Sequence, residues 1–232
     1  MSATLKKKEK TAASSKARVL ILDELPIIRE RMAQLIESEP DLVVCGDTDD
    51  ARKAKRIIAD AQPDLVVTSL SLKNSHGLDF IKDLHASYPQ LRILVFSMYD
   101  ELIYAERAIR AGARGFIRKH ESTKELLRAM RWVVDGEIYM SDQVTVTKVT
   151  RFFSRSSIKG LSSLEQLSDR ELQVLQLIGH GQSTRQIANA LHVDIKTIET
   201  YRSRIKVKLN LATAVELAHY ARKWLEESIR VR

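Results

Sequence analysis

The sequence has a single cysteine and no long hydrophobic run. Cys45 is alone among 232 residues, so the chain cannot form an internal disulfide, and it lies in the apolar run 42–46, which is typical of a buried strand. No stretch approaches the roughly 20 apolar residues that a membrane-spanning helix needs. The charged first residues also lack the apolar segment of a secretory signal. We therefore expect a protein of the reducing cytoplasm that has no membrane partner.

Internal repeats and ligand-spaced histidines are also missing. His76 and His120 stand singly in expected loops, where we expect solvent exposure rather than metal binding, and His180 and His192 flank an expected helix as turn or cap residues. The composition, 44% hydrophobic and 29% charged, is that of a globular chain long enough for two modest domains. This balance excludes disorder of the whole chain.

The net charge of +8 is unevenly distributed. Residues 1–18 hold six Lys or Arg against Glu9, and residues 194–208 hold five against two acids. Clustered cationic side chains favour a polyanion partner, because they gain affinity by releasing counterions from nucleic acid. We expect residues 1–17 to form a disordered basic tail.

Residues 167–218 show helical periodicity with two marked helix starts. Ser168 with Glu171, and Ser183 with Gln186, fit the capping box that satisfies free amides at a helix N-terminus. In the third segment, 194–209, one narrow arc is apolar and should face a core: Ile195, Ile198, Ile205 and Leu209. The opposite arc carries side chains that can bond phosphates and base edges: Lys196, Thr197, Glu199, Thr200, Ser203 and Arg204. With a fourth helix over 212–226, whose apolar side is expected to hold Val215, Ala218 and Leu225, this predicts a DNA-binding helix-turn-helix domain.

The stretches LSDRE, GQSTRQIA and KTIETYRSRIKVKL resemble the LuxR-type helix-turn-helix of the NarL/FixJ response-regulator family. The resemblance implies a homodimer on double-stranded DNA, with Val215 and Ala218 of the fourth helix contributing to pairing. Glu199 departs from the family, which often has a basic residue there, so no base preference is carried over. The full set of expected DNA-contacting residues is Ser183, Arg185, Lys196, Thr197, Glu199, Thr200, Tyr201, Ser203, Arg204 and Lys208.

Between residues 18 and 134, five short apolar runs alternate with five helical patterns. Runs that are apolar on both faces predict a parallel sheet covered by helices on both sides, with a site at the carboxyl ends of its strands. The side chains expected to converge there are Asp23, Glu24, Ser69, Ser97 and Lys119. The predicted fold is therefore α/β, a doubly wound (βα)5 parallel sheet, followed by an all-α domain of four helices.

The stretches LDELPIIRERMAQLI, FSMYDE and GARGFIRK resemble the receiver domain of two-component response regulators. The resemblance makes Asp23 and Glu24 the acidic metal-binding pair, Ser97 the switch hydroxyl and Lys119 the phosphate-binding lysine. It also puts Ser69 where the family has its phosphoacceptor aspartate. Serine lacks the carboxylate that forms an acyl phosphate and removes an oxygen ligand from Mg2+, so we expect phosphotransfer to fail.

We therefore expect a phosphorylation-independent transcription regulator that is not an enzyme and needs no cofactor. Its parts should be a basic tail (1–17), a receiver-like domain (18–134), a linker (135–163) and a helix-turn-helix domain (164–232). Lys119 should form an ion pair with Asp23 and Glu24 without metal, the alternative being residual Mg2+ binding by the two acids. Two alternative functions stay open: a receiver that gates DNA binding through a regulatory protein or ligand, and unconventional phosphate chemistry at Ser69 or Ser71.

Overall fold

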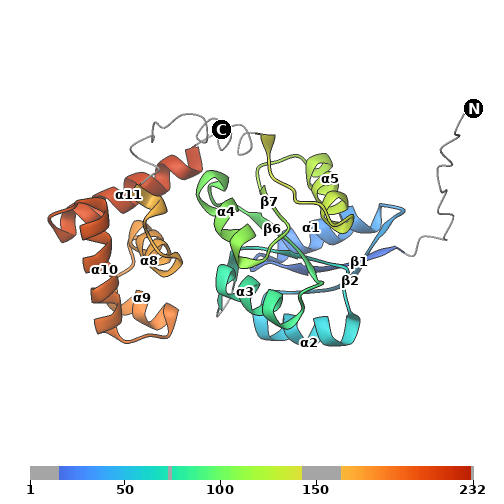
Figure 1. The fold of residues 1–232 in the computed structure, drawn as a ribbon, viewed down its shortest axis with the longest axis horizontal. Helices are drawn as coiled ribbons and strands as arrows, with labels where there is room; N and C mark the ends of the chain where they lie inside the picture. The colour runs from blue at the N-terminus through green and yellow to red at the C-terminus, as the bar shows by residue number, and fades with distance from the viewer. Residues whose placement is uncertain (1–15, 73–74, 143–162, 231–232) are drawn as a thin grey trace, which may run out of the picture.

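The computed structural model describes residues 16–72, 75–142 and 163–230, which form a sheet domain and a helical domain (Figure 1). Most of the expected basic tail and linker, including a short helix that the sequence suggests over 144–153, lie outside the described residues. Among the helices that the structure describes, none has the length and hydropathy needed to cross a bilayer.

The receiver-like domain is built on one parallel five-stranded sheet, and this confirms the predicted fold class. The strand order is β2-β1-β3-β6-β7. The strands are β1 (Ala17–Leu22), β2 (Leu42–Thr48), β3 (Leu65–Thr68), β6 (Arg92–Ser97) and β7 (Gly115–Arg118). The direction in which successive strands are added to the sheet reverses between β1 and β3, and the carboxyl ends of these two strands carry Asp23 and Ser69. In such sheets this turning point is where sites form.

Helices cover both faces of the sheet, because successive side chains of a strand point to opposite faces and are buried on both. Val19 and Ile21 point to the face covered by α1 (Pro26–Glu37) and α5 (Thr123–Val134), whereas Leu20 and Leu22 point to the other face. The other face is covered by α2 (Ala51–Ala61), α3 (Gly77–Ser87) and α4 (Glu101–Ala111). Cys45 lies in β2 as expected, but it is half-buried, and burial raises the pKa of its thiol.

A short hairpin between β3 and α3 is absent from the sequence prediction. Strand β4 (Ser71–Leu72) pairs antiparallel with β5 (Ser75–His76). The hairpin returns so closely that a Cβ on Gly77 would lie 2.5 Å from the Cα of Leu70, so only glycine fits there. Its return buries His76, whose side chain is only 10% exposed, and the expectation that His76 faces solvent is wrong. His120 is exposed, as expected.

The helical domain contains four main helices: α8 (Asp169–Gly179), α9 (Thr184–Leu191), α10 (Ile195–Leu209) and α11 (Ala214–Arg230). Both predicted capping boxes are present at α8 and α9, and His180 and His192 occupy the C-caps of these helices. Helix α11 packs closely on α8. The carbonyl oxygen of Ala221 lies so near Gly179 that a Cβ on this glycine would be only 2.7 Å from it.

Two details of the predicted core are wrong. Ile198 and Ile205 are fully buried, but Ile195 is 40% exposed, because it is the first residue of α10 and lies at the edge of the domain. On α11 the buried side is formed by Leu217, Ala221 and Trp224. Val215 is 79% exposed, and Ala218 is exposed as well, so neither faces the core.

Candidate DNA interface and receiver pocket

The outer face of α10, defined here as Lys196, Glu199, Thr200, Ser203 and Arg204, is exposed to solvent. Asp194 caps the helix by accepting from the amide of Lys196 at 2.8 Å, and the buried Ile198 and Ile205 fix which face turns outward. The helical domain turns α8 toward the sheet domain and α10 away from it (Figure 1). The outer face is therefore open in the same arrangement in which the two domains contact each other.

Other expected DNA-contacting residues differ in accessibility. Ser183 and Arg185 are exposed at the start of α9, where the Ser183 hydroxyl also accepts from the amide of Gln186 in the capping box. Thr197 and Tyr201 are partly buried, and Tyr201 packs against the core.

Lys208 is engaged inside the domain, contrary to its expected place on the DNA-contacting face. Its ammonium lies 2.6 Å from Oε2 of Glu171 and 3.0 Å from the carbonyl oxygen of Gln166. Burial of Glu171 opposes ionisation, but the hydrogen bonds from Lys208 and Ser168 outweigh it and hold the pKa of this carboxyl below its ordinary value. The pair ties α10 to α8, so Lys208 is not free to bind phosphate in this arrangement.

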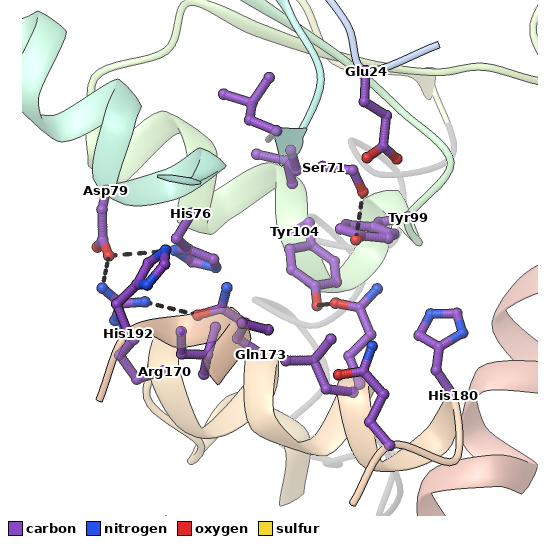
Figure 2. Close-up of a pocket in the computed structure, with 17 residues that line it drawn as sticks. Glu24, Ser71, His76, Asp79, Tyr99, Tyr104, Arg170, Gln173, His180 and His192 are labelled. Carbon is purple, nitrogen blue, oxygen red and sulfur yellow. Dashed lines mark hydrogen bonds and ion pairs between the residues drawn. The ribbon is translucent and has the colours of Figure 1, made fainter. Parts of the chain in front are cut away.

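The receiver pocket is closed by an ion pair between Lys119 and Asp23. Asp23 is 1% exposed and pairs through Oδ2 with the Lys119 ammonium, while its Oδ1 accepts from the amide of Leu25 at 3.0 Å. Both carboxylate oxygens thus have partners within the protein. Glu24 lies outside this pair, because its side chain is exposed and its carboxylate points toward Ser71 and Tyr99 instead (Figure 2). Across the described residues, no group of three or more His, Cys, Asp or Glu is arranged to hold a metal ion.

The two serines of the pocket are buried. Ser69 is 2% exposed, and its Oγ accepts from the amide of Ser71 at 3.1 Å. Ser97 is 1% exposed, and its Oγ accepts from the amide of Tyr99 at 3.2 Å. Both hydroxyls therefore stabilise the loops that follow their strands.

A charged cluster joins the two domains, and we call it the domain clamp. Asp169 at the start of α8 accepts from Lys82 of α3 at 2.7 Å and from Arg107 of α4 at 2.9 Å, and Arg170 pairs with Asp79 at 2.8 Å. Burial of Asp169 opposes ionisation, but hydrogen bonds from Lys82 and Arg107 outweigh it and lower the pKa of this carboxyl. Sequence reasoning missed the clamp, since no local pattern tells which surface charges meet across domains.

Beside the clamp, the two domains together line a partly open cavity of about 580 Å³, which we call the interdomain cavity (Figure 2). Two hydrogen bonds lie in its wall: Ser71 and Tyr99 share a hydrogen bond of 2.7 Å, and Tyr104 donates to Gln176 of α8 at 3.3 Å. The rings of Tyr99 and Tyr104 lie 5.0 Å apart. The loop after Ser69 is thereby connected to the first helix of the helical domain.

Two family models match the chain: the response regulator receiver domain over residues 19–131, and the bacterial regulatory proteins of the luxR family over residues 165–221. The chain is 30% identical over 211 residues to the "Oxygen regulatory protein NreC" of Staphylococcus epidermidis, which covers 89% of this chain and 97% of that protein. A LuxR-family two-component response regulator from Aurantimonas sp. SI85-9A1 is 30% identical, with a TM-score of 0.57, over 60% of this chain and 100% of that one. RcsB from Salmonella enterica serovar Typhimurium, bound to promoter rprA with phosphomimetic BeF3-, shares the fold with a TM-score of 0.67 at 22% identity, over 90% of this chain and 99% of that one.

Proposed function

Because the chain belongs to the LuxR family of response regulators, we propose that it regulates transcription as a dimer on DNA without phosphorylation of its receiver-like domain. NreC is named as a regulatory protein and RcsB is bound to promoter DNA, and the chain is a regulator of this kind rather than an enzyme. We further propose that it acts in the cytoplasm and needs no metal.

The closed receiver pocket carries the proposal of phosphorylation independence. An acyl phosphate needs a carboxylate nucleophile, and Ser69 offers a hydroxyl that is 2% exposed and already accepts a hydrogen bond. Lys119 is held by Asp23 and is not free to meet an incoming phosphoryl group. The same burial argues against unconventional phosphate chemistry at Ser69. Neutral serine also lacks the charge of the phosphorylated state, so it does not imitate it.

Constitutive DNA binding is supported by the open outer face of α10. The domain clamp uses α8, which lies on the side of the helical domain that faces the sheet domain, whereas α10 lies on the far side (Figure 1). No opening of the domains is then required before the side chains of α10 enter a major groove.

Pairing on DNA is supported by the exposure of Val215 and Ala218. A valine side chain that is 79% exposed on a surface helix gains by burial against a second copy. One helix-turn-helix reads only a few base pairs, and two copies spaced by one DNA turn give useful discrimination.

Sequencing of genomic fragments recovered by the purified protein tests the proposal. We expect one motif with two half-sites, spaced by about 10 base pairs or a multiple of this. A single isolated half-site would contradict pairing, and random fragments would contradict sequence-specific regulation. On the recovered operator, chelation of divalent metal should leave the affinity unchanged.

The phosphate contacts can be tested by salt titration. Lys196→Ala or Arg204→Ala should flatten the dependence of log K on log salt by about one unit, since each removes one cation beside the DNA backbone. Lys53→Ala is the matched control, because Lys53 is an exposed lysine on α2 of the other domain. An unchanged slope in both α10 variants would mean that another face binds DNA.

The alternative of a gated regulator is favoured by one observation, the contact between the domains. A receiver-like domain that is clamped to α8 and shares a cavity with it can pass a binding event to the DNA-binding domain. Gating is compatible with the proposed function and raises the question of what enters the cavity.

A further inference from the structure

The interdomain cavity has walls from both domains. The receiver-like domain contributes Glu24, the β4–β5 hairpin and two tyrosines, and the helical domain contributes α8 and the ends of α9 (Figure 2). A volume of about 580 Å³ lies within the roughly 300–1,000 Å³ range of small-molecule sites. Nothing in the expected DNA-contacting set lines it, so the cavity is separate from the outer face of α10.

Among the charged side chains that line the cavity, one carboxylate is not matched by a cation. Arg170 lies 2.8 Å from Asp79 and donates to Gln173 at 2.9 Å, so its positive charge is already matched. Glu24 turns toward the cavity and the hydroxyls of Ser71 and Tyr99 (Figure 2). The proximity of this charge is reflected in Tyr99, because burial chiefly, and Glu24 in addition, raise the pKa of its phenol. Among the Asp, Glu, Lys and Arg residues of the lining, two are acidic and one is basic, so their summed formal charge is negative.

Two buried polar atoms of lining residues have no hydrogen-bond partner within the described part of the chain. They are Oε1 of Gln182 and Nδ1 of His76. The nearest carboxylate oxygen to Nδ1 belongs to Asp79 and is 3.6 Å away, which is too long for a hydrogen bond. An oxygen that is buried without a donor costs free energy, and a bound donor would recover it.

We propose that the interdomain cavity binds a small organic cation with a planar head rich in N–H donors, such as an amidinium, a guanidinium or a protonated aminated ring. The N–H groups complement the carboxylate of Glu24, and the rest of the ligand meets the lining from the helical domain, where Gln182 Oε1 lacks a donor. The rings of Tyr99 and Tyr104 provide an aromatic wall that suits a planar cation. A compact anion would be repelled by the carboxylate of Glu24 and is therefore excluded.

Binding at this place couples the two domains. A ligand that fills the cavity contacts both domains, so it favours the clamped arrangement over any arrangement in which the domains separate, in proportion to its difference in affinity. This step rests on the proposed function, since it gives a receiver-like domain without phosphotransfer a chemical input. Failure of ligand binding and failure of DNA binding are measured separately, because the ligand is titrated without DNA.

Benzamidine is a suitable probe, and benzoate is its matched anion with the same ring and similar size. Titration into the full-length protein at pH 8 and at constant ionic strength should give saturable binding of benzamidine by calorimetry and none of benzoate. Hydrogen exchange should show protection in both the 71–76 hairpin and the 180–192 segment. No saturable binding, equal binding of benzoate, or protection in one domain alone would each overturn the proposal.

Variants localise the probe. Glu24→Gln keeps the size of an exposed side chain and should weaken benzamidine binding roughly fivefold or more, because a charge-assisted hydrogen bond becomes neutral. Gln182→Met removes the orphan acceptor and should weaken it several-fold. Glu37→Gln is the control, because Glu37 is an exposed glutamate at the end of α1 and does not line the cavity. If both cavity variants bound benzamidine like the control, the site would lie elsewhere and the inference would be wrong.

Discussion

Replacing Asp169 with asparagine should separate the melting of the two domains. Asp169 is the centre of the domain clamp, and its side chain is 23% exposed, beside Arg107 at 13% and Lys82 at 49%. A hydrogen bond to a charged group contributes about 1.5–3 kcal/mol when well buried, and a half-exposed ion pair contributes at most about 1 kcal/mol. Asparagine keeps the shape but loses the charge, so we expect the docking of the domains to weaken by roughly 2 kcal/mol.

Calorimetry of the full chain measures this loss. One kcal/mol shifts the melting temperature of a domain of 60–100 residues by about 4–8 °C, so the helical domain should melt roughly 10 °C earlier. Asp60→Asn, an exposed carboxylate on α2, is the control and should change little. A double-mutant cycle with Arg107→Met should show strong non-additivity. Additive effects, or an unchanged melting curve for Asp169→Asn, would refute the clamp as a stabilising contact.

Two further predictions concern α10. Thr200→Ala with Ser203→Ala should leave the fold intact and reduce operator discrimination by roughly 1–3 kcal/mol per lost base contact. Ile205→Ala should instead destabilise the domain by about 2–5 kcal/mol. Thermal melts measure the stability of each variant, and titrations on operator and scrambled DNA measure its discrimination. Lys208→Met should lower stability by about 1–3 kcal/mol with little change in the salt slope of DNA binding, because Lys208 pairs with the buried Glu171. Since the pKa of Glu171 is lowered in the fold, the contribution of this pair is present above about pH 4.5 and is lost as the pH falls through the lowered value, so the variant and wild type should converge in acid melts. An early melt of the Thr200/Ser203 variant, or a flattened salt slope for Lys208→Met, would show that these residues have been placed on the wrong faces.

Local sequence patterns predicted most of the fold. All five helical patterns expected between residues 18 and 134 are helices in the structure, α1 to α5, because each carries an apolar stripe that packs against the sheet. Both capping boxes were predicted for the same reason, since a cap is decided by residues three positions apart.

The predictions that failed concern side chains whose position is decided by tertiary packing. Lys208 was assigned to the DNA-contacting set because it is a lysine near the end of a basic helix, and only the packing of α10 on α8 brings it to Glu171. Val215 and Ala218 were placed on the apolar side of the fourth helix, although a helix with several apolar residues has two plausible apolar sides. Packing against α8 selected Leu217, Ala221 and Trp224 instead. The domain clamp and the interdomain cavity depend on how two domains meet, which periodicity does not encode.

Titration of operator DNA with the full-length protein, with and without acetyl phosphate and Mg2+, tests phosphorylation independence most directly. Intact mass is recorded on the same samples. The closed Lys119–Asp23 pair and the buried Ser69 predict that no phosphoryl group is added and that the dissociation constant stays the same within about twofold. Stoichiometric phosphorylation of the receiver-like domain together with tighter operator binding would contradict the account.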